Sequence, residues 1–143
     1  MEKEFKLVTL DFDTLVSAMA ETREKADEMI EAFALENDIT DGRRFILDFI
    51  MIQGKVEYVT YITYLSVPTG TKGSKGLQTV VLKNNKFVHF VGNKEDYHNY
   101  LRGHEHLNFD EFLKENGLKA DISKIYVLTE VIGDEYNFYI PYN

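Results

Sequence analysis

The sequence predicts an α+β fold in which a strand–helix–strand–strand unit is used twice. Runs rich in β-branched and aromatic residues alternate with segments of helical periodicity. The order of these elements in residues 5–68 returns in residues 77–143. Each copy finishes in an aromatic-rich strand that an aliphatic residue and a proline close, at Pro68 and Pro141. We therefore expect antiparallel sheets with helices packed on one side and a central cleft.

Length and composition bound the class of protein. The 143 residues fit one domain that can bury a sizeable core. The formal net charge of -8 makes nucleic acid a poor partner, because its phosphates are normally met by a Lys/Arg surface. The absence of cysteine excludes disulfides, thiolate metal sites and cysteine nucleophiles. No apolar segment approaches the ~20 residues that span a bilayer, and the charged start does not resemble a secretory signal. We expect a cytoplasmic protein without membrane association.

In the first half, the clearest element is a helix over residues 22–37. Thr22 is a suitable N-cap, because its hydroxyl can accept from a free backbone N–H. Short extended segments at 5–10 and 15–19 precede this helix, with a polar turn between them. The apolar positions of the helix follow its period of 3.6; they are Ala26, Met29, Ile30, Phe33 and Ala34.

Two long strands follow the helix, at residues 43–53 and 56–67. The connection through Gly54 is so short that they should form an antiparallel hairpin. Pro68 cannot donate to a strand ladder and ends the second strand. Residues 69–76 have the composition of a flexible linker and lack the spacing of a phosphate-binding loop.

The second half repeats this order with shorter elements. Polar turns and glycines separate its strands, and a helical segment interrupted at Gly103 lies between them. Asn108 begins a last helical piece, which Gly117 ends. The remaining predicted elements are strands at 77–82 and 87–91, a helix at 94–102, and a closing hairpin of strands at 125–132 and 136–140.

The second half also carries a residue pattern that is similar to that of a known family. From Leu77 to Gly92 it reads Leu-x-x-Val-x-Leu-x-x-x-x-Phe-Val-x-Phe-x-Gly, and after a helix the chain ends near Tyr-Ile-Pro at Pro141. This pattern and the order of elements resemble the GyrI-like domains, also called bacterial transcription-activator effector-binding domains. As an order of elements the resemblance covers nearly the whole chain.

The resemblance implies a stand-alone GyrI-like domain over residues 1–143. Its halves, about 5–68 and 77–143 around a linker at 69–76, would be related by a pseudo-twofold axis. The cleft between them would bind amphipathic, often cationic, small molecules against a buried carboxylate and several tyrosines. Some members of the family hydrolyse reactive small molecules and others bind protein partners. A genetic link to a secretion or toxin locus is a further expectation.

Two carboxylates are candidates for such a cleft. Asp48 lies among isoleucines in a strand that otherwise reads as buried, and Glu130 lies in the equivalent strand of the second half. A carboxylate in an apolar wall must find a partner. It could hold a ligand cation or act as a base with a raised pKa. Alternatively, the carboxylate is exposed to solvent or, for Asp48, pairs with Arg43, Arg44 or a nearby lysine.

The tyrosines supply the remaining candidates for ligand binding. Tyrosine combines a packing ring with a hydroxyl, which suits an amphipathic pocket or a protein interface. Most of the tyrosines in the strands are expected in the core or on a sheet surface. The predicted ligand-binding set is Asp48, Tyr61, Tyr64, Tyr126 and Glu130.

Neither a catalytic centre nor a metal site is predicted. His89 alternates with apolar residues in a strand and is interpreted as structural. His98, His104 and His106 are close in sequence, but they lack the i, i+4 spacing of a zinc-binding helix. No nucleophile elbow or nucleotide fingerprint is present. The sequence therefore predicts no cofactor and no enzyme activity.

Three functions remain open. The first is a binding domain for amphipathic or cationic small molecules. The second is a protein-interaction module, as a monomer or homodimer, whose aromatic surface docks a partner or its own copy. The third, a hydrolase with Glu130 or Asp48 as base, is allowed but not required by any motif.

Overall fold

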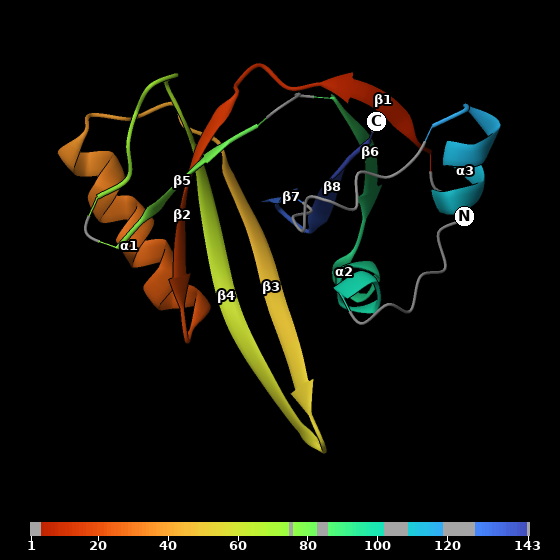
Figure 1. Cartoon of the computed structure of the whole chain (residues 1–143), viewed down its shortest axis with the longest axis horizontal. Coiled ribbons are helices and arrows are strands. Elements are labelled where there is room, and N and C mark those ends of the chain that lie inside the picture. Colours follow the sequence, from red (N-terminus) through yellow and green to blue (C-terminus); the bar gives the residue numbers. More distant parts are fainter. Residues whose placement is uncertain (1–3, 75, 83–85, 102–108, 119–127, 143) are drawn as a thin grey trace. The chain divides into compact units, whose positions relative to one another are not determined.

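The structure is a computed structural model that describes residues 4–74, 76–82, 86–101, 109–118 and 128–142. Within these residues the fold is α+β, with eight strands in antiparallel pairings and three helices (Figure 1). The chain divides into two compact units. The central unit is Asp11–Asn84, and the terminal unit combines Met1–Leu10 with Asn85–Asn143.

The central unit is a four-stranded sheet with one helix. Its strand order is β3-β4-β2-β5, and adjacent strands in this order pair antiparallel. Its elements are β2 (Thr14–Ala20), α1 (Arg23–Glu36), β3 (Arg44–Gln53), β4 (Val56–Val67) and β5 (Gln78–Val81).

Helix α1 forms where the sequence predicts it, and it covers one face of the central sheet (Figure 1). The hydroxyl of Thr22 accepts from the backbone N–H of Lys25 at 3.1 Å, which caps the first turn. The helix buries the predicted apolar stripe, including Ile30 and Phe33. This stripe forms one core cluster with Val16 of β2 and Leu65 of β4. Val16 and Leu65 therefore lie on the face of the sheet that α1 covers.

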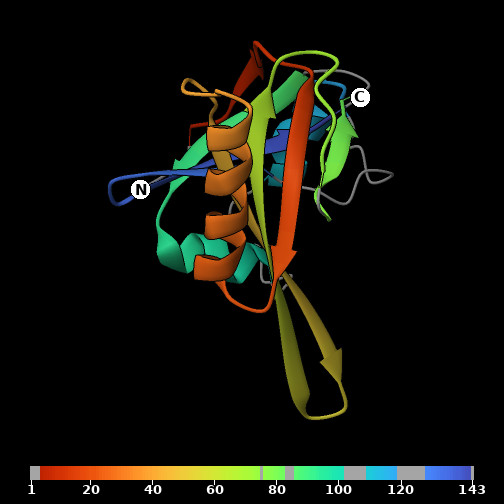
Figure 2. The ribbon, with the colours of Figure 1, turned by 90° about the vertical axis from the view of Figure 1, so that its left-hand side faces the viewer.

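Strands β3 and β4 form the predicted hairpin. The pairing runs without a bulge from Arg44 opposite Leu65 to Gln53 opposite Val56. The two-residue loop begins at Gly54, whose φ of 62° is the conformation that a tight hairpin turn requires and that glycine adopts without strain. The hairpin extends past the ends of β2 and α1 (Figure 2).

The terminal unit is also a four-stranded sheet, with the order β1-β6-β8-β7. Its described helices are short. None of the helices in the described part of the chain is long and apolar enough to cross a membrane. The elements are β1 (Lys6–Thr9), β6 (Lys86–Gly92), α2 (Lys94–Leu101), α3 (Phe109–Glu115), β7 (Leu128–Ile132) and β8 (Glu135–Pro141).

Aromatic rings connect the helices of the terminal unit to one face of its sheet. The ring of Tyr97 in α2 lies 6.2 Å from that of Phe138, which stacks on Phe90 at 4.7 Å. The ring of Phe5 lies 5.1 Å from both Phe90 and Phe112 of α3. Phe90 and Phe138 therefore mark the helix side of this sheet, and the residues that alternate with them mark the opposite, helix-free side.

The two units repeat one pairing order. In the central unit, β2 precedes the helix and pairs with β4, and β4 also pairs with β3, so the order is β2-β4-β3. The terminal unit has the same arrangement as β6-β8-β7. Each unit adds one short strand from the other half of the sequence, β5 beside β2 and β1 beside β6. The compact units thus differ from the sequence halves by one exchanged strand each.

The segment predicted as a linker, residues 69–76, carries specific hydrogen bonds. The N–H of Thr71 donates to the carbonyl of Pro68, and that of Leu77 to the carbonyl of Ser74, both at 3.1 Å. Leu77 also packs against the core cluster under α1. The segment therefore contributes to the central unit.

Candidate functional site

The predicted site residues of the central unit lie on both faces of its sheet. Asp48 of β3 is directly opposite Tyr61 of β4, so both side chains point to the same face. Tyr61 alternates with Thr63 and Leu65, which places Asp48 and Tyr61 on the helix side. Tyr64 is on the helix-free side, where it is buried. The sheet therefore separates Tyr64 from the other two.

Arg23 gathers the helix-side residues into one network. Its guanidinium donates to the carboxylate of Asp48. It also donates to the carbonyl of Ile62 at 2.6 Å and to the hydroxyl of Thr63 at 2.8 Å. The guanidinium carbon lies 5.3 Å from the ring centroid of Tyr61, a cation–π distance. These contacts tie the start of α1 to both strands of the hairpin.

This network describes the environment of Asp48. Its side chain is 15% exposed, and its charge is compensated by a guanidinium of the same chain. The pairing matches the alternative in which Asp48 meets a protein cation, but that cation is Arg23 rather than Arg43 or Arg44. The sequence pattern of the strand contains no sign of this partner, because Arg23 belongs to the helix.

The terminal unit carries a second polar group, on the helix-free side of its sheet. Asn137 of β8 is opposite Glu130 of β7, and its amide nitrogen donates to the Glu130 carbonyl at 3.4 Å. Its amide oxygen lies 2.9 Å from Nε2 of His89 in β6. The imidazole stacks on Tyr139 with the ring centroids 4.8 Å apart. We call His89, Glu130, Asn137 and Tyr139 the His89 cluster.

The two hydrogen bonds of Asn137 indicate which imidazole nitrogen of His89 donates to it. The amide nitrogen must face the Glu130 carbonyl, since a carbonyl only accepts, and the amide oxygen therefore faces His89. Nε2 of His89 must donate to that oxygen. In the neutral ring this leaves Nδ1 as the acceptor.

Burial within the His89 cluster is graded. Asn137 and Tyr139 are each 9% exposed, whereas His89 and Glu130 are half-buried. In the cluster, Asn137 and Tyr139 are buried in the sheet, whereas solvent reaches the side chains of Glu130 and His89. This combination of ring faces and a carboxylate on one side of a sheet has the chemistry that favours an organic cation.

Glu130 and Asp48 are not equivalent positions, although they lie in equivalent strands. Counted back from the two closing prolines, Asn137 corresponds to Tyr64. Their partners across the hairpins are Glu130 and Phe45. Glu130 therefore corresponds to Phe45, on the helix-free side, and Asp48 lies on the other side. Counting back from the prolines and then across the two hairpin loops shows in the sequence itself that Asp48 and Glu130 are not at equivalent positions.

The remaining predicted residues are accounted for as follows. Tyr126, His104 and His106 lie outside the described residues. Among the described residues, no group of three or more His, Asp or Glu side chains could hold a metal ion. His98 lies in α2.

The central unit also has a small half-open pocket between α1 and the segment that precedes β5. Its volume is about 180 Å³ and it is mainly apolar. None of the predicted site residues lines it. The lining residues are Met29, Ala32, Phe33, Glu36, Ser74 and Leu77.

Fold and site together define an α+β protein whose two units repeat one strand order. No protein-family model matches the chain, and no curated protein matches it. Among solved structures, an uncharacterized conserved protein from Listeria innocua aligns with a TM-score of 0.61 at 10% identity, covering 99% of this chain and 93% of that one. A hydrolase from Listeria innocua aligns with a TM-score of 0.62 at 10% identity, covering 99% and 92%. At this identity the likeness extends to the fold alone.

Proposed function

We propose that the chain is a cytoplasmic domain of the GyrI-like, effector-binding type that binds small amphipathic cations. The repeated β-α-β-β pairing order supports the family assignment, because it is the arrangement that the sequence resemblance implies. The observation that carries the function is the His89 cluster, with its aromatic rings and carboxylate on one face of a sheet.

The chemistry of the His89 cluster suits such a ligand. Tyr139 and His89 offer stacked ring surfaces for the apolar body of a ligand, and an aromatic face attracts a cation. Glu130 adds a carboxylate, which gives the contact a direction and favours positive charge. In this proposal Glu130 is the charge-selecting residue. Asp48 and Tyr61 support the fold through Arg23, while Tyr64 and Tyr126 remain candidates.

Titration with a fluorescent lipophilic cation tests the proposal. We expect Glu130→Gln to weaken dye binding by about tenfold, equivalent to about 1.4 kcal/mol, through loss of the charge contact. Glu135→Gln is a matched control, because Glu135 is an exposed carboxylate in the same hairpin. It should bind the dye like the wild type. Equal affinity of the Glu130 variant and the wild type, with circular dichroism confirming the fold, would exclude the His89 cluster as the site.

A hydrolase that uses the same cluster is the second candidate. One structural neighbour is a hydrolase from Listeria innocua. The hydrogen bond from Nε2 of His89 to Asn137 leaves Nδ1 as an acceptor that could take a proton from water. A panel of esters and epoxides tests this candidate. Turnover that survives in both His89→Gln and Glu130→Gln would remove it.

The alternative of a protein-interaction module has an observation of its own. Large apolar side chains are exposed near the tip of the β3–β4 hairpin, among them Phe49, Met51 and Tyr58. Contiguous exposed apolar surface is typical of interaction sites.

A further inference from the structure

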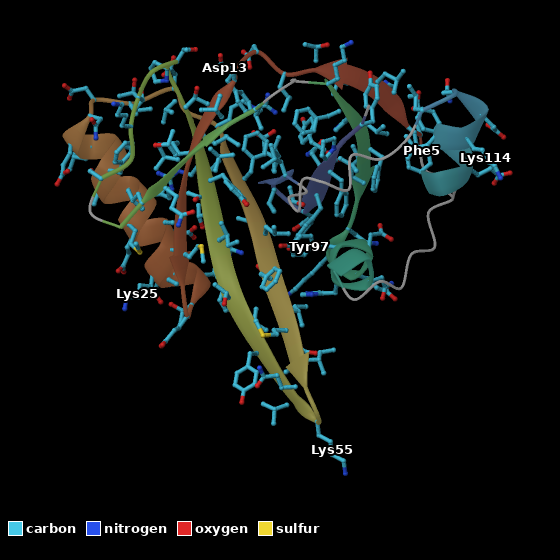
Figure 3. The ribbon with its side chains drawn as sticks, in the orientation of Figure 1. Phe5, Asp13, Lys25, Lys55, Tyr97 and Lys114 are labelled. Carbon is cyan, nitrogen blue, oxygen red and sulfur yellow. The ribbon has the colours of Figure 1, made fainter. Side chains whose placement is uncertain are left out.

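The pocket between α1 and the segment before β5 has no part in the cation binding proposed above. It lies along α1 from the middle of the helix to its last turn. Lys25 marks the opposite end of this helix, where its side chain points away from the strands (Figure 3). The helix contributes one wall of the pocket, and Ser74 and Leu77 contribute the other.

The helix wall is apolar, and a small residue leaves it hollow. Met29 and Phe33 belong to the face of α1 that packs on the sheet, and Phe33 is only 3% exposed. Ala32 lies between them in the sequence and is exposed. Because its side chain is a single methyl group, the space above it is not filled. The bottom of the pocket is therefore part of the packed core of the central unit.

The second wall is held in place by hydrogen bonds. The N–H of Gly73 donates to the hydroxyl of Thr79 in β5 at 2.8 Å. The N–H of Leu77 donates to the carbonyl of Ser74 at 3.1 Å. The side chain of Leu77 also packs against the core cluster under α1. A ligand would thus meet a preformed pocket and would not have to order the segment on binding.

The volume of the pocket, about 180 Å³, fits a molecule with one ring. An engineered cavity of about 150 Å³ with apolar walls binds benzene, whereas drug-sized ligands occupy pockets of about 300–1,000 Å³. The lining favours an aromatic ring over an aliphatic one. The thioether of Met29 and the ring of Phe33 both make favourable contacts with aromatic rings.

The polar groups at the pocket favour a neutral ligand. Glu36 lines the pocket but already has a partner within the chain, so it offers no free charge. A charged ligand would therefore lose hydration without gaining a counter-charge. An anion is disfavoured most, because the last turn of α1 contains no basic residue and the C-terminus of a helix repels negative charge. The hydroxyl of Ser74 can donate to or accept from a neutral polar group.

We propose that this pocket binds a neutral phenol of one ring. The ring would lie against Met29, Phe33 and Leu77, above the methyl group of Ala32. The phenolic hydroxyl would lie at the rim beside Ser74. This ligand class differs from the cations proposed for the His89 cluster, and the two sites do not depend on each other.

Phenol itself is the probe, and the methyl groups of Met29, Ala32 and Leu77 report its binding in carbon-13 nuclear magnetic resonance. We expect saturable shifts at these methyl groups with a Kd on the order of 1 mM, because a one-ring ligand has few atoms to contribute affinity. Benzoate should bind about tenfold or more weakly, since its charge has no partner. Benzoate binding as tight as that of phenol would overturn the choice of a neutral ligand. The absence of shifts at these methyl groups at about 10 mM phenol would overturn the proposal.

Ala32→Leu tests the location by filling the pocket. Leucine is a good helix former, so circular dichroism should show an intact fold. We expect this variant to lose phenol binding. Lys25→Leu is the matched control: it places the same side chain on α1 outside the pocket, where it leans toward the start of the helix. The control should bind phenol like the wild type. Undiminished binding by Ala32→Leu would contradict this site.

Ser74→Ala tests the orientation of the ligand. Toluene has the same ring as phenol, with a methyl group in place of the hydroxyl. The variant should bind phenol about fivefold more weakly and toluene as tightly as the wild type, because only phenol loses a hydrogen bond. Equal weakening of both ligands would show that Ser74 only shapes the pocket and would contradict the proposed contact. Glu130→Gln should bind phenol normally, so a failure of cation binding at the His89 cluster is a separate result.

Discussion

Arg23, the first residue of α1, donates from its guanidinium to the carboxylate of Asp48 in β3. The same guanidinium reaches the carbonyl of Ile62 and the hydroxyl of Thr63 in β4. Thr63 in turn donates to the carboxylate of Asp27 at 2.7 Å. One side chain thus connects the start of the helix with two strands. The Arg23 side chain is 25% exposed, so water screens the ion pair only partly.

We expect Asp48→Ala to lower the free energy of unfolding by about 2–4 kcal/mol, because it leaves a largely buried guanidinium without its carboxylate. Urea denaturation measures this change. The double variant Arg23→Met with Asp48→Leu should recover part of the loss, since an apolar pair leaves no uncompensated charge. If the effects of Arg23→Met alone and Asp48→Leu alone add up to that of the double variant, the two residues are not coupled.

Local sequence signals predict some elements of this fold but not the contacts of the Arg23 network. Thr22 as a helix cap and Gly54 as a hairpin turn are local signals, and both elements form where expected. The partner of Asp48 depends on where α1 lies over the sheet, which local patterns do not contain. The alternation in β3 groups residues by face, but it does not say which face the helix covers.

The same limit applies to the terminal unit. The sequence favours a structural role for His89, because a single histidine in a strand is usually structural. Its contacts with Asn137 and Tyr139 come from a strand about fifty residues later, which local patterns do not reveal. Glu130 is a site residue that the sequence predicts. Its neighbours became identifiable only with the pairing of β6, β7 and β8.

Asp13 gives a prediction for the acid side of the stability profile. Its carboxylate accepts hydrogen bonds from the hydroxyls of Thr69 and Thr14, each 2.8 Å long. The Thr69 bond, and then the Thr14 bond, lower the pKa of Asp13 from its ordinary 3.8. Because the folded-state pKa is depressed, the stabilisation is present above the unfolded pKa. It is lost as the pH falls through the folded value.

Thr69→Val should therefore raise the pKa of Asp13 toward 3.8. A titration of the Asp13 carboxyl carbon by nuclear magnetic resonance measures this shift. Asp13→Asn should make the urea midpoint fall less steeply from about pH 6 to about pH 3 than it does in the wild type. A pKa of Asp13 that does not move in the Thr69 variant would show that this hydroxyl is not responsible for the depression.

Gly42 is required for a close approach between the segment before β3 and the end of β4. A Cβ atom at this position would lie 2.7 Å from the carbonyl oxygen of Ser66 and 2.6 Å from Cδ1 of Leu65. The backbone oxygen cannot move aside as a flexible side chain can. We expect Gly42→Ala to destabilise the protein by about 1–3 kcal/mol, as overpacking does. Asp41→Ala, at the exposed preceding residue, should change the urea midpoint little. Equal midpoints for the two variants would show that the segment shifts freely.

Thr129 of β7 carries a buried hydroxyl that has no hydrogen-bond partner in the part of the chain that the structure describes. The residue is 1% exposed and lies opposite Phe138 on the helix side of the terminal sheet. Thr129→Val replaces the hydroxyl with a methyl group of similar shape. We expect a gain of about 1–2 kcal/mol in unfolding free energy, because the desolvation penalty disappears. Thr129→Ser keeps the hydroxyl and loses the methyl group, so it should cost about 1 kcal/mol. A destabilised valine variant in urea denaturation would show that the hydroxyl makes a favourable contact.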